Sequence, residues 1–306
     1  MQADGERVAL AAFVACNVAV ATNPIAVRFS NRELAPLWGA GLRFGAAAAL
    51  LVGLMCVFRL RLPGGRALLG AILFGVLNFG AAVGLAYYAF VHVHAGLGQI
   101  TYALVPLAAL LLAVLQREER MQLRAIVGAV FAVGGVAVLA EAPLRAHVPP
   151  LALLALLLSV ICVAQSAVLV RRLPPMHPIT MNAVGSAAAA AVLLPASFIA
   201  GESTQLPQNA TTWSAFAWLV LVGSVVMVIL YLVVLNHWEA SRAAYVFVLS
   251  PFITLLLSAW LDNEPIGPSL FLGGFLILVG VYVGALSPRR ARRLEAVAAA
   301  QASSGG

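Results

Sequence analysis

Residues 92–135 read HVHAGLGQITYALVPLAALLLAVLQREERMQLRAIVGAVFAVGG, and residues 237–280 read HWEASRAAYVFVLSPFITLLLSAWLDNEPIGPSLFLGGFLILVG. A shift of 145 positions brings identical residues other than leucine together at six places in these two stretches. The matched pairs are His92 with His237, Ala95 with Ala240, Pro106 with Pro251, Glu119 with Glu264, Gly128 with Gly273, and Gly135 with Gly280. Histidine, proline and glutamate are scarce in this chain, so their coincidence in one register indicates an internal repeat.

The composition of the chain is that of a membrane protein. Of the 306 residues, 63% are hydrophobic and 9% are charged, whereas soluble domains carry roughly 25% charged residues. The apolar residues come in stretches of about 20, the length at which a helix crosses a hydrocarbon core of roughly 30 Å. The stretches lack the alternation of strands, and open sheets leave backbone groups unsatisfied in lipid. The sequence therefore predicts an all-α membrane protein.

Ten apolar segments follow one another along the chain. They lie at 8–27, 34–58, 67–91, 95–116, 122–140, 150–170, 177–200, 213–236, 241–261 and 267–286. The repeat divides them into a first five-helix unit over 1–145 and a second over 146–288, followed by a basic tail over 289–306. Because five is an odd number, the second unit enters the membrane upside down. We therefore expect ten transmembrane helices in two inverted five-helix repeats, an architecture typical of secondary transporters.

The distribution of arginine predicts the orientation of the chain. All 18 basic residues are arginine, and a cytoplasmic N-terminus places 14 of them on the cytoplasmic side but only 3 in external turns. Both termini are then cytoplasmic. The turn after the fourth helix carries Arg117, Arg120 and Arg124, and its counterpart after the ninth carries Asp262 and Glu264. The net charge of +7 reflects this bias, so we expect the lipid bilayer and not a nucleic acid as the partner of the basic residues.

Motifs of enzymes and metal sites are absent from the sequence. No HExxH, GxSxG or Walker-type motif occurs, and no pair of aspartates lies inside an apolar segment. Cys16, Cys56 and Cys162 are isolated, without the spacing of a metal site or a disulfide framework. The sequence therefore predicts no catalytic residue, metal or cofactor. Two alternatives to a transporter stay open, an intramembrane transferase for acyl or lipid-head groups and a membrane assembly protein.

The repeated residues make the chain similar to the EamA branch of the drug/metabolite transporter superfamily. The resemblance is carried by Asn23, Pro24, Pro36, Arg43, Ala95, Gly96, Leu97, Pro106, Glu119, Gly128 and Gly135, and in the second copy by Ala240, Ser241, Pro251, Glu264, Gly273 and Gly280. It implies an exporter of amino acids or related metabolites in a bacterial inner membrane, with a central cavity between the halves. The distantly related small multidrug exporters depend on a glutamate in their first helix, which this chain lacks, and this argues against cation-for-proton exchange by that route.

Arg43 is the charged residue that lies deepest inside a predicted helix. Such residues normally face a cavity or a partner. We hypothesise that Arg43 attracts a carboxylate of a small-molecule substrate, since an unpaired positive charge in a low dielectric favours carboxylates and zwitterions over lipophilic cations. The alternative is that it holds carbonyl groups freed by the Pro106 kink or anchors helix ends.

Further polar residues at membrane depth complete the predicted substrate site. Gln99 and Tyr102 share a helix face with Pro106 at i, i+3, i+7 spacing. The other members are Asn78, Gln165 and Tyr231. Polar groups in lipid also hold helices together; the two roles are balanced for Gln99, Tyr102 and Gln165. The structural role is favoured for the others, and also for Asn23, Tyr88 and Asn182.

The repeated prolines and glutamates have predicted roles as hinges and helix caps. Pro106 and Pro251 lie mid-helix, where proline removes a backbone hydrogen bond and bends the helix. We predict that the two bends act as hinges, with static bends as the alternative. Glu119 and Glu264 precede the fifth and tenth helices, where a carboxylate complements the helix N-terminal dipole.

The repeated glycines predict a close helix pair. Gly128 and Gly135, and likewise Gly273 and Gly280, are seven residues apart and therefore share one face of a helix. Small residues let helices approach closely in membranes, so we expect the fifth and tenth helices to pack closely, away from the cavity. The sequence leaves a monomer and a homodimer equally open.

Overall fold

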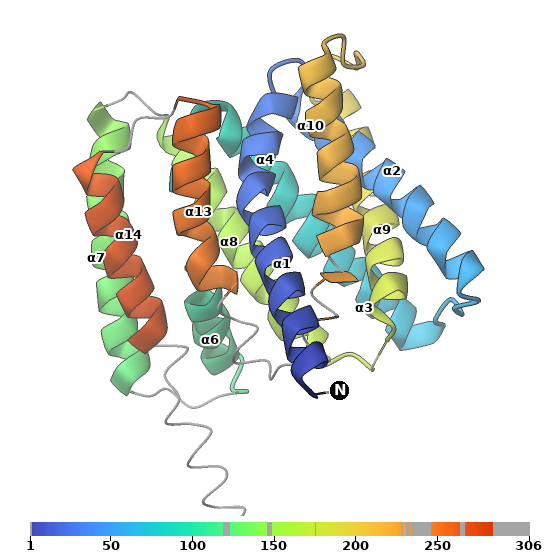
Figure 1. Cartoon of the computed structure of the whole chain (residues 1–306), viewed down its shortest axis with the longest axis horizontal. Coiled ribbons are helices and arrows are strands. Elements are labelled where there is room, and N and C mark those ends of the chain that lie inside the picture. The colour runs from blue at the N-terminus through green and yellow to red at the C-terminus, as the bar shows by residue number, and fades with distance from the viewer. Residues whose placement is uncertain are drawn as a thin grey trace, which may run out of the picture.

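The chain folds into helices joined by short turns. The computed structural model describes residues 2–118, 123–145, 149–174, 176–227, 229–230, 233, 246–263 and 267–283, and the regular structure within them is helical (Figure 1). The first half contains α1 (Gln2–Ser30), α2 (Pro36–Val57), α3 (Gly65–Gly75), the π-helical turn η1 (Val76–Ala81), α4 (Ala82–His92), α5 (Ala95–Tyr102), α6 (Val105–Leu115) and α7 (Leu123–Arg145). The second half contains α8 (Pro150–Val170), α9 (Pro178–Ile199), α10 (Ala210–Val220), the π-helical turn η2 (Leu221–Val226), α13 (Val246–Leu261) and α14 (Pro268–Val281).

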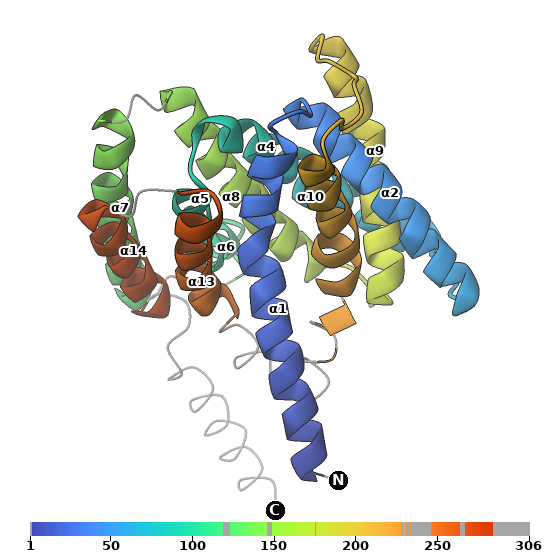
Figure 2. The ribbon, with the colours of Figure 1, turned by 45° about the horizontal axis from the view of Figure 1, so that its top comes forward.

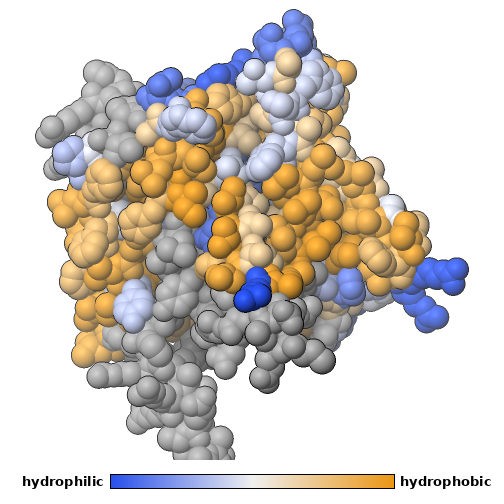
Figure 3. Space-filling view, viewed as in Figure 1, coloured by the Kyte–Doolittle hydropathy of each residue, from blue (hydrophilic) through white to orange (hydrophobic). Residues whose placement is uncertain are grey.

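The predicted apolar segments coincide with these helices. Within the described residues, six helical stretches are long and apolar enough to cross a membrane, namely Leu10–Ser30, Pro36–Val57, Gly65–His92, Ala95–Leu115, Pro150–Val170 and Pro178–Ile199. The remaining segments contain the shorter apolar helices Ile126–Val138, Ala210–Val226, Ser250–Leu261 and Pro268–Val281. Hydrophobic side chains cover most of the described surface in Figure 3, and hydrophilic ones gather towards its upper and lower edges. This surface suits a bilayer as its solvent.

Two pairs of long helices stand at opposite ends of the bundle. α2 packs along α9, and α7 packs along α14 (Figure 1, Figure 2). A Cβ atom added to Gly135 would lie 2.7 Å from the carbonyl oxygen of Gly273, and one added to Gly280 would lie 2.5 Å from that of Gly128. Real Cβ atoms do not approach so closely, so the four glycines allow α7 and α14 to touch along their backbones. The predicted close packing of the fifth and tenth helices is confirmed.

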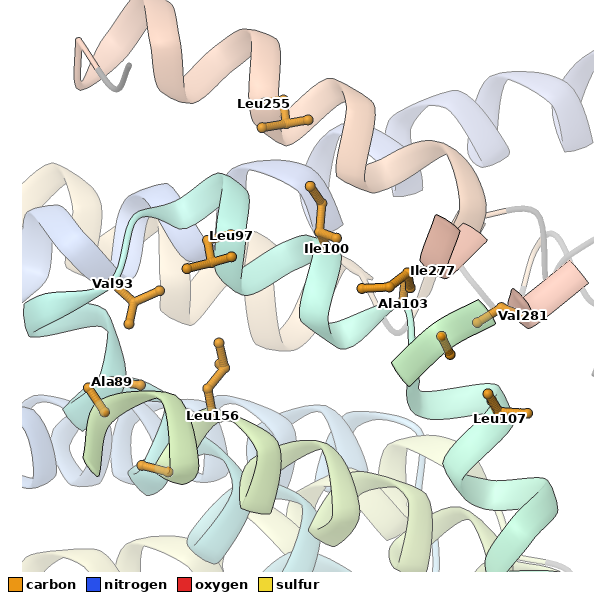
Figure 4. Close-up of a cluster of buried hydrophobic side chains, with 13 residues drawn as sticks. Ala89, Val93, Leu97, Ile100, Ala103, Leu107, Leu156, Leu255, Ile277 and Val281 are labelled. Atoms are coloured by element: carbon orange, nitrogen blue, oxygen red, sulfur yellow. The ribbon is translucent and has the colours of Figure 1, made fainter. Parts of the chain in front are cut away.

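The core lies between these two end pairs. α8 contacts α4 and α6, whereas α1 contacts α10 and α13. One cluster of buried side chains joins α4, α5, α8, α13 and α14 through residues such as Leu97, Ile100, Leu156 and Leu255 (Figure 4). A second cluster gathers around Phe44, Tyr87, Phe90, Leu193 and Leu219. Tyr102 packs against both clusters, so it lies where the two parts of the core meet.

Two π-helical turns interrupt long helices at matched positions. η1 separates α3 from α4, and η2 follows α10. Their first residues, Val76 and Leu221, are 145 positions apart, which is the spacing of the sequence repeat. A π turn inserts one extra residue into a helical turn and is frequent at functional sites. Hydrophobic periodicity did not predict either turn.

The two repeated prolines differ in their structural setting. Pro251 lies inside α13, as expected. Pro106 lies in the first turn of α6, after a break in which Ala103 and Leu104 donate backbone hydrogen bonds three residues back, to Ile100 and Thr101. The prediction that Pro106 lies mid-helix is wrong. Helix α5 ends at Tyr102, and Pro106 lies in the first turn of the next helix, α6, a position that proline fits. The helix is interrupted before Pro106 and runs through Pro251 in the described residues, and a hinge role for either proline stays a prediction.

Ion pairs join the turns at each end of the bundle. At one end Asp262, after α13, pairs with Arg28 Nε (2.7 Å) and Arg32 Nη2 (2.6 Å) near the end of α1. At the other end Arg172, after α8, pairs with Glu118, after α6. The turns that meet in each of these pairs are ones that the arginine distribution predicts on the same side of the membrane.

Carboxylates from two loops also satisfy the N-termini of helices in each other's half. Glu33, before α2, accepts hydrogen bonds from the backbone N–H groups of Gln208 (2.8 Å) and Asn209 (3.2 Å), at the start of α10. Glu202, after α9, accepts one from the backbone N–H of Trp38 (2.9 Å), in the first turn of α2. A carboxylate at a helix N-terminus pairs with free N–H groups and favours the helix dipole. These contacts hold the α1–α2 loop and the α9–α10 loop together.

Candidate substrate site

Arg43 lies in the core, between α2, α4 and η2. Its residue is only 5% exposed. Nε donates to Ser224 Oγ (3.2 Å), Nη2 to the carbonyl oxygen of Gly223 (3.3 Å) and Nη1 to the hydroxyl of Tyr87 (3.5 Å). The guanidinium carbon also lies 5.2 Å from the ring centroid of Phe44. A permanently charged group is thus held at membrane depth by polar atoms of two other elements, η2 and α4.

The partners of Arg43 are neutral and its hydrogen bonds are long. Charge-assisted bonds from guanidinium to carboxylate are usually about 2.7–2.9 Å, and within the described ranges no carboxylate pairs with Arg43. A guanidinium has five N–H donors, so its three bonds leave donors for another acceptor. The carbonyl that it binds belongs to η2, so the structure places Arg43 against this turn and not at the break before Pro106.

The widened turn η2 lets two polar side chains converge on its surface. Ser224 Oγ donates back to the carbonyl oxygen of Leu219 (3.0 Å), five residues earlier. Gly223, one residue before, has no side chain of its own. A Cβ atom there would lie 3.0 Å from Asn23 Nδ2 and 3.1 Å from Arg43 Nη2. An amide from α1 and a guanidinium from α2 therefore approach the same side of the same turn.

Gln99 and Tyr102, the predicted pair on α5, each bond a residue of the other half. Gln99 Nε2 donates to Ser250 Oγ of α13 (3.0 Å). The Tyr102 hydroxyl is hydrogen-bonded to Ser159 Oγ of α8, and Ser159 donates its own proton to the carbonyl oxygen of Ala82 (2.7 Å). Tyr102 is therefore the donor in its bond. Both residues connect helices across the core.

Asn78 and Gln165 bond partners other than Arg43. Asn78 Oδ1, in η1, accepts from Ser166 Oγ of α8 (3.0 Å). Gln165 Oε1 accepts from Gln116 Nε2 (2.7 Å), whose Oε1 accepts in turn from Arg172 Nη2 (2.8 Å) near the end of the bundle. The structure thus distributes the predicted site residues among several hydrogen-bonded groups, and these bonds do not link them to Arg43.

Three of the predicted residues lie outside the described part of the chain, namely Tyr231, Glu119 and Glu264. Of the residues for which a structural role was favoured, Asn182 Nδ2 donates to the carbonyl oxygen of Pro178 in its own helix (2.9 Å), and the Tyr88 ring packs edge-on against His92. Among the described residues, no three His, Cys, Asp or Glu side chains gather as ligands of a metal would.

Sequence reasoning missed the partners of Arg43. Tyr87, Gly223 and Ser224 were not identified, and Asn23 was assigned a structural role. The sequence carried a signal for the turn η2. The 145-residue shift places Gly223 and Ser224 opposite Asn78 and Phe79, so each copy has a polar residue at this point. Comparing the two copies at polar positions would have identified η2 as a second polar point in the third helix of each half.

The helical fold, the apolar surface and the buried polar groups define a polytopic membrane protein with a polar interior. A model of the EamA-like transporter family matches residues 7–140 and, a second time, residues 150–285. The chain therefore belongs to the EamA-like transporter family.

Curated relatives and a solved structure agree with this assignment. The chain is 28% identical over 239 residues to the uncharacterized inner membrane transporter YedA of Escherichia coli (strain K12), covering 78% of each protein. It is 24% identical over 260 residues to an uncharacterized transporter of Archaeoglobus fulgidus, covering 84% of this chain and 91% of that protein. A solved crystal structure aligns over 94% of this chain and 98% of its own, with a TM-score of 0.62 and 18% identity, which shows a shared fold.

Proposed function

We propose that this protein is a secondary transporter that exports a small carboxylate-bearing metabolite, an amino acid or an organic acid, by alternating access. The observation that carries the proposal is Arg43, a buried guanidinium whose partners are all neutral oxygens. A buried charge without a counter-charge is unfavourable by several kcal/mol, on the order of the penalty for breaking a buried ion pair. A cargo carboxylate would supply the missing negative charge, whereas a lipophilic cation would be repelled by the positive charge of Arg43.

The correspondence between the two halves supports an inverted repeat of five helices each. α8 contacts α4 and α6, which belong to the third and fourth of the ten predicted helices. Its counterpart in the first half, α1, contacts α10 and α13, which belong to the eighth and ninth. The matched positions of η1 and η2 and the reciprocal glycine contacts of α7 and α14 follow the same correspondence. Inverted repeats of this kind place a site near the midplane and expose it to either side in turn.

The proposed orientation has both termini in the cytoplasm. The arginine bias of 14 to 3 supports it, and so do the contacts between turns that the bias predicts on one side. A reporter active only in the cytoplasm, fused after Ser304, should be active, and the same reporter inserted within 201–212 should be silent. Equal activity of the two fusions would contradict ten spans with cytoplasmic ends.

The function is tested by reconstituting the purified protein in proteoliposomes. Liposomes loaded with one labelled compound from a panel of the twenty amino acids, simple organic acids and lipophilic cations are assayed for efflux and for exchange. We expect efflux of at least one amino acid or organic acid, and none of the cations, above protein-free liposomes. Movement of cations alone would overturn the assignment of cargo. Chemical conversion of a panel compound or of the lipid without transport would favour the enzyme alternative.

A further inference from the structure

We infer that Asn23, Gly223 and Arg43 form the subsite that binds the carboxylate of the cargo, on the surface of the π-helical turn η2. The inference rests on the proposed function, because it names the atoms by which that cargo is held. It adds a second donor, Asn23, and gives the glycine of η2 a specific role as the position that keeps the two donors within reach of one ligand.

Asn23 is the first independent observation. Its side chain is half-buried in α1, and it makes no hydrogen bond to any residue that the structure describes. An amide at membrane depth without a partner is unfavourable because its polar atoms lose their hydrogen bonds to water, and lipid offers no replacement. An amide held in this position next to a guanidinium is therefore suited to a ligand that accepts hydrogen bonds.

The convergence of the two nitrogens is the second observation. Asn23 Nδ2 and Arg43 Nη2 lie 3.0 and 3.1 Å from one point, the Cβ position of Gly223, and the Asn23 amide oxygen Oδ1 lies 3.2 Å from it. The two oxygens of a single carboxylate can reach two donors that are this close. Arg43 Nη2 now bonds the Gly223 carbonyl oxygen at 3.3 Å. A carboxylate is a stronger acceptor than an amide carbonyl, so the cargo would replace that carbonyl as the partner of Arg43.

The equivalent turn η1 lacks these features. The position that corresponds to Gly223 is Asn78, whose side chain fills the space and already accepts from Ser166. In the hydrogen bonds described around η1 no arginine takes part. Of the two turns, the carboxylate subsite therefore lies on η2 and not on η1.

The test measures binding of a minimal probe, sodium acetate, with acetamide as its neutral isostere. The purified protein in detergent is unfolded by heat at increasing acetate, with ionic strength held constant by sodium methanesulfonate. Wild type should gain about 3 °C in its unfolding midpoint at an acetate concentration of about ten times its Kd, and acetamide should give no gain. Gly53→Ala is the matched glycine control, since nothing lies within 4 Å of a Cβ there, and it should respond like wild type.

Two variants of the subsite decide the inference. Asn23→Asp places a carboxylate beside Arg43 and should abolish the acetate response, because the internal charge takes the place of the ligand. Gly223→Ala pushes a methyl group against both donors and should reduce the response at least threefold. An acetate response of wild-type size in Asn23→Asp, or no response in wild type itself, would overturn the subsite.

The same variants separate the subsite from the transport proposal. Transport of a panel amino acid that is undiminished in Asn23→Asp and in Gly223→Ala would overturn the subsite while the transporter stands. An acetate response that follows the expected pattern, in a protein that moves no panel compound, would support the subsite and contradict the proposed function. If Gly223→Ala does not fold, Asn23→Asp and its neutral companion Asn23→Leu give the decision, since both should lose the response.

Discussion

The two π-helical turns share a backbone geometry but differ in what surrounds them. Next to η1, a Cβ atom on Gly75 would lie 2.3 Å from the Cα atom of Gly185 in α9, so two backbones touch there. On η2, the atoms nearest to the Cβ position of Gly223 are the polar ends of Asn23 and Arg43. The first turn is a packed joint between helices, and the second is a polar surface next to an unpaired charge.

This difference shows that the repeat preserves backbone shape more strictly than side-chain chemistry. The spacing of the turns, the glycine contacts of α7 with α14 and the helix neighbours all recur in both halves. The charge of Arg43 has no counterpart, since the 145-residue shift places it opposite Ala188. A symmetric scaffold suits a protein that must open to both sides, whereas a single charge suits recognition of one end of an asymmetric metabolite.

The packed joint at η1 should be the point most sensitive to substitution. Gly75→Ala would force a methyl group against the backbone of α9, and we expect destabilisation of about 2–3 kcal/mol or loss of the folded protein. Gly53→Ala, in open surroundings, should be neutral or slightly stabilising because alanine favours a helix over glycine. Thermal unfolding in detergent checks both. A Gly75→Ala protein as stable as Gly53→Ala would show that η1 is not a tight joint.

The charge at η2 should matter for transport more than for folding. Arg43→Gln removes a buried charge that has no counter-charge among the described residues, so we expect transport to be abolished while the unfolding midpoint stays equal or rises. Arg43→Lys keeps the charge but loses the planar fork, and should transport with a rate reduced at least about tenfold. Efflux from proteoliposomes and thermal unfolding are measured on the same preparations.

The opposite result for Arg43 would remove the contrast between the turns. If Arg43→Gln unfolds the protein while Arg43→Lys transports normally, the residue is an anchor for η2. The preference for anionic or zwitterionic cargo would then have no support from this residue.

The polar contact on η1 should contribute a moderate amount of stability and no selectivity. Asn78→Ala removes one of two acceptors of Ser166 Oγ, which also donates to the carbonyl oxygen of Val163 (2.7 Å), so we expect a loss of at most about 1 kcal/mol. Ser166→Ala should lower the unfolding free energy by a similar amount, and the double variant by less than the sum of the two. Asn78→Ala should transport the panel compounds with the same ranking of rates as wild type. A changed order would place Asn78 in contact with the cargo.

The smallest effect is expected at Glu33, which fastens the start of the helix that leads to η2. The backbone N–H of Gln208, with further donors from Asn209 and Thr212, lowers the pKa of the Glu33 carboxyl below its usual 4.5 despite partial desolvation. A lowered pKa in the folded state means that the carboxylate stabilises the fold above the unfolded pKa, and that this stability is lost as the pH falls through the folded pKa. The side chain is exposed, so solvent screening keeps the effect small.

The check for Glu33 is a series of unfolding midpoints between pH 7 and pH 3. Wild type should be slightly more stable than Glu33→Gln at neutral pH, and this difference should shrink as the pH falls through the lowered pKa of the folded carboxyl. A difference that persists at pH 3 would mean that the glutamine loses a contact unrelated to charge.

Local properties of the chain were enough to predict the helices and the repeat. Hydrophobic length determines where a segment can cross a bilayer, so the segment 150–170 coincides with α8 and the segment 178–199 differs from its prediction by one residue at each end. The glycine contacts of α7 and α14 could also be predicted, since a spacing of seven places two glycines on one helix face. The depth of Arg43 followed from its position within an apolar segment.

Features that depend on backbone hydrogen bonds within a helix were not accessible in this way. The break before Pro106 and the absence of one before Pro251 separate two prolines with the same register in the repeat. The π turns leave little trace in the hydrophobic pattern, because one extra residue rotates the helix face by about 100° but these helices are apolar on most faces. Glu202 at the N-terminus of α2 is 165 residues from its partner Leu37, a separation at which no local pattern operates.

The partners of the buried polar groups depended on helix packing alone. Apolar length and residue spacing specify that a side chain lies at membrane depth and which face of its helix it occupies, but many neighbouring helices are compatible with that face. Arg43 meets Gly223 across 180 positions of sequence because the close contacts of α2 with α9 and of α1 with α10 bring η2 beside α2. That choice is made by the fit of small and large side chains between whole helices, a property of the assembled bundle and not of any single segment.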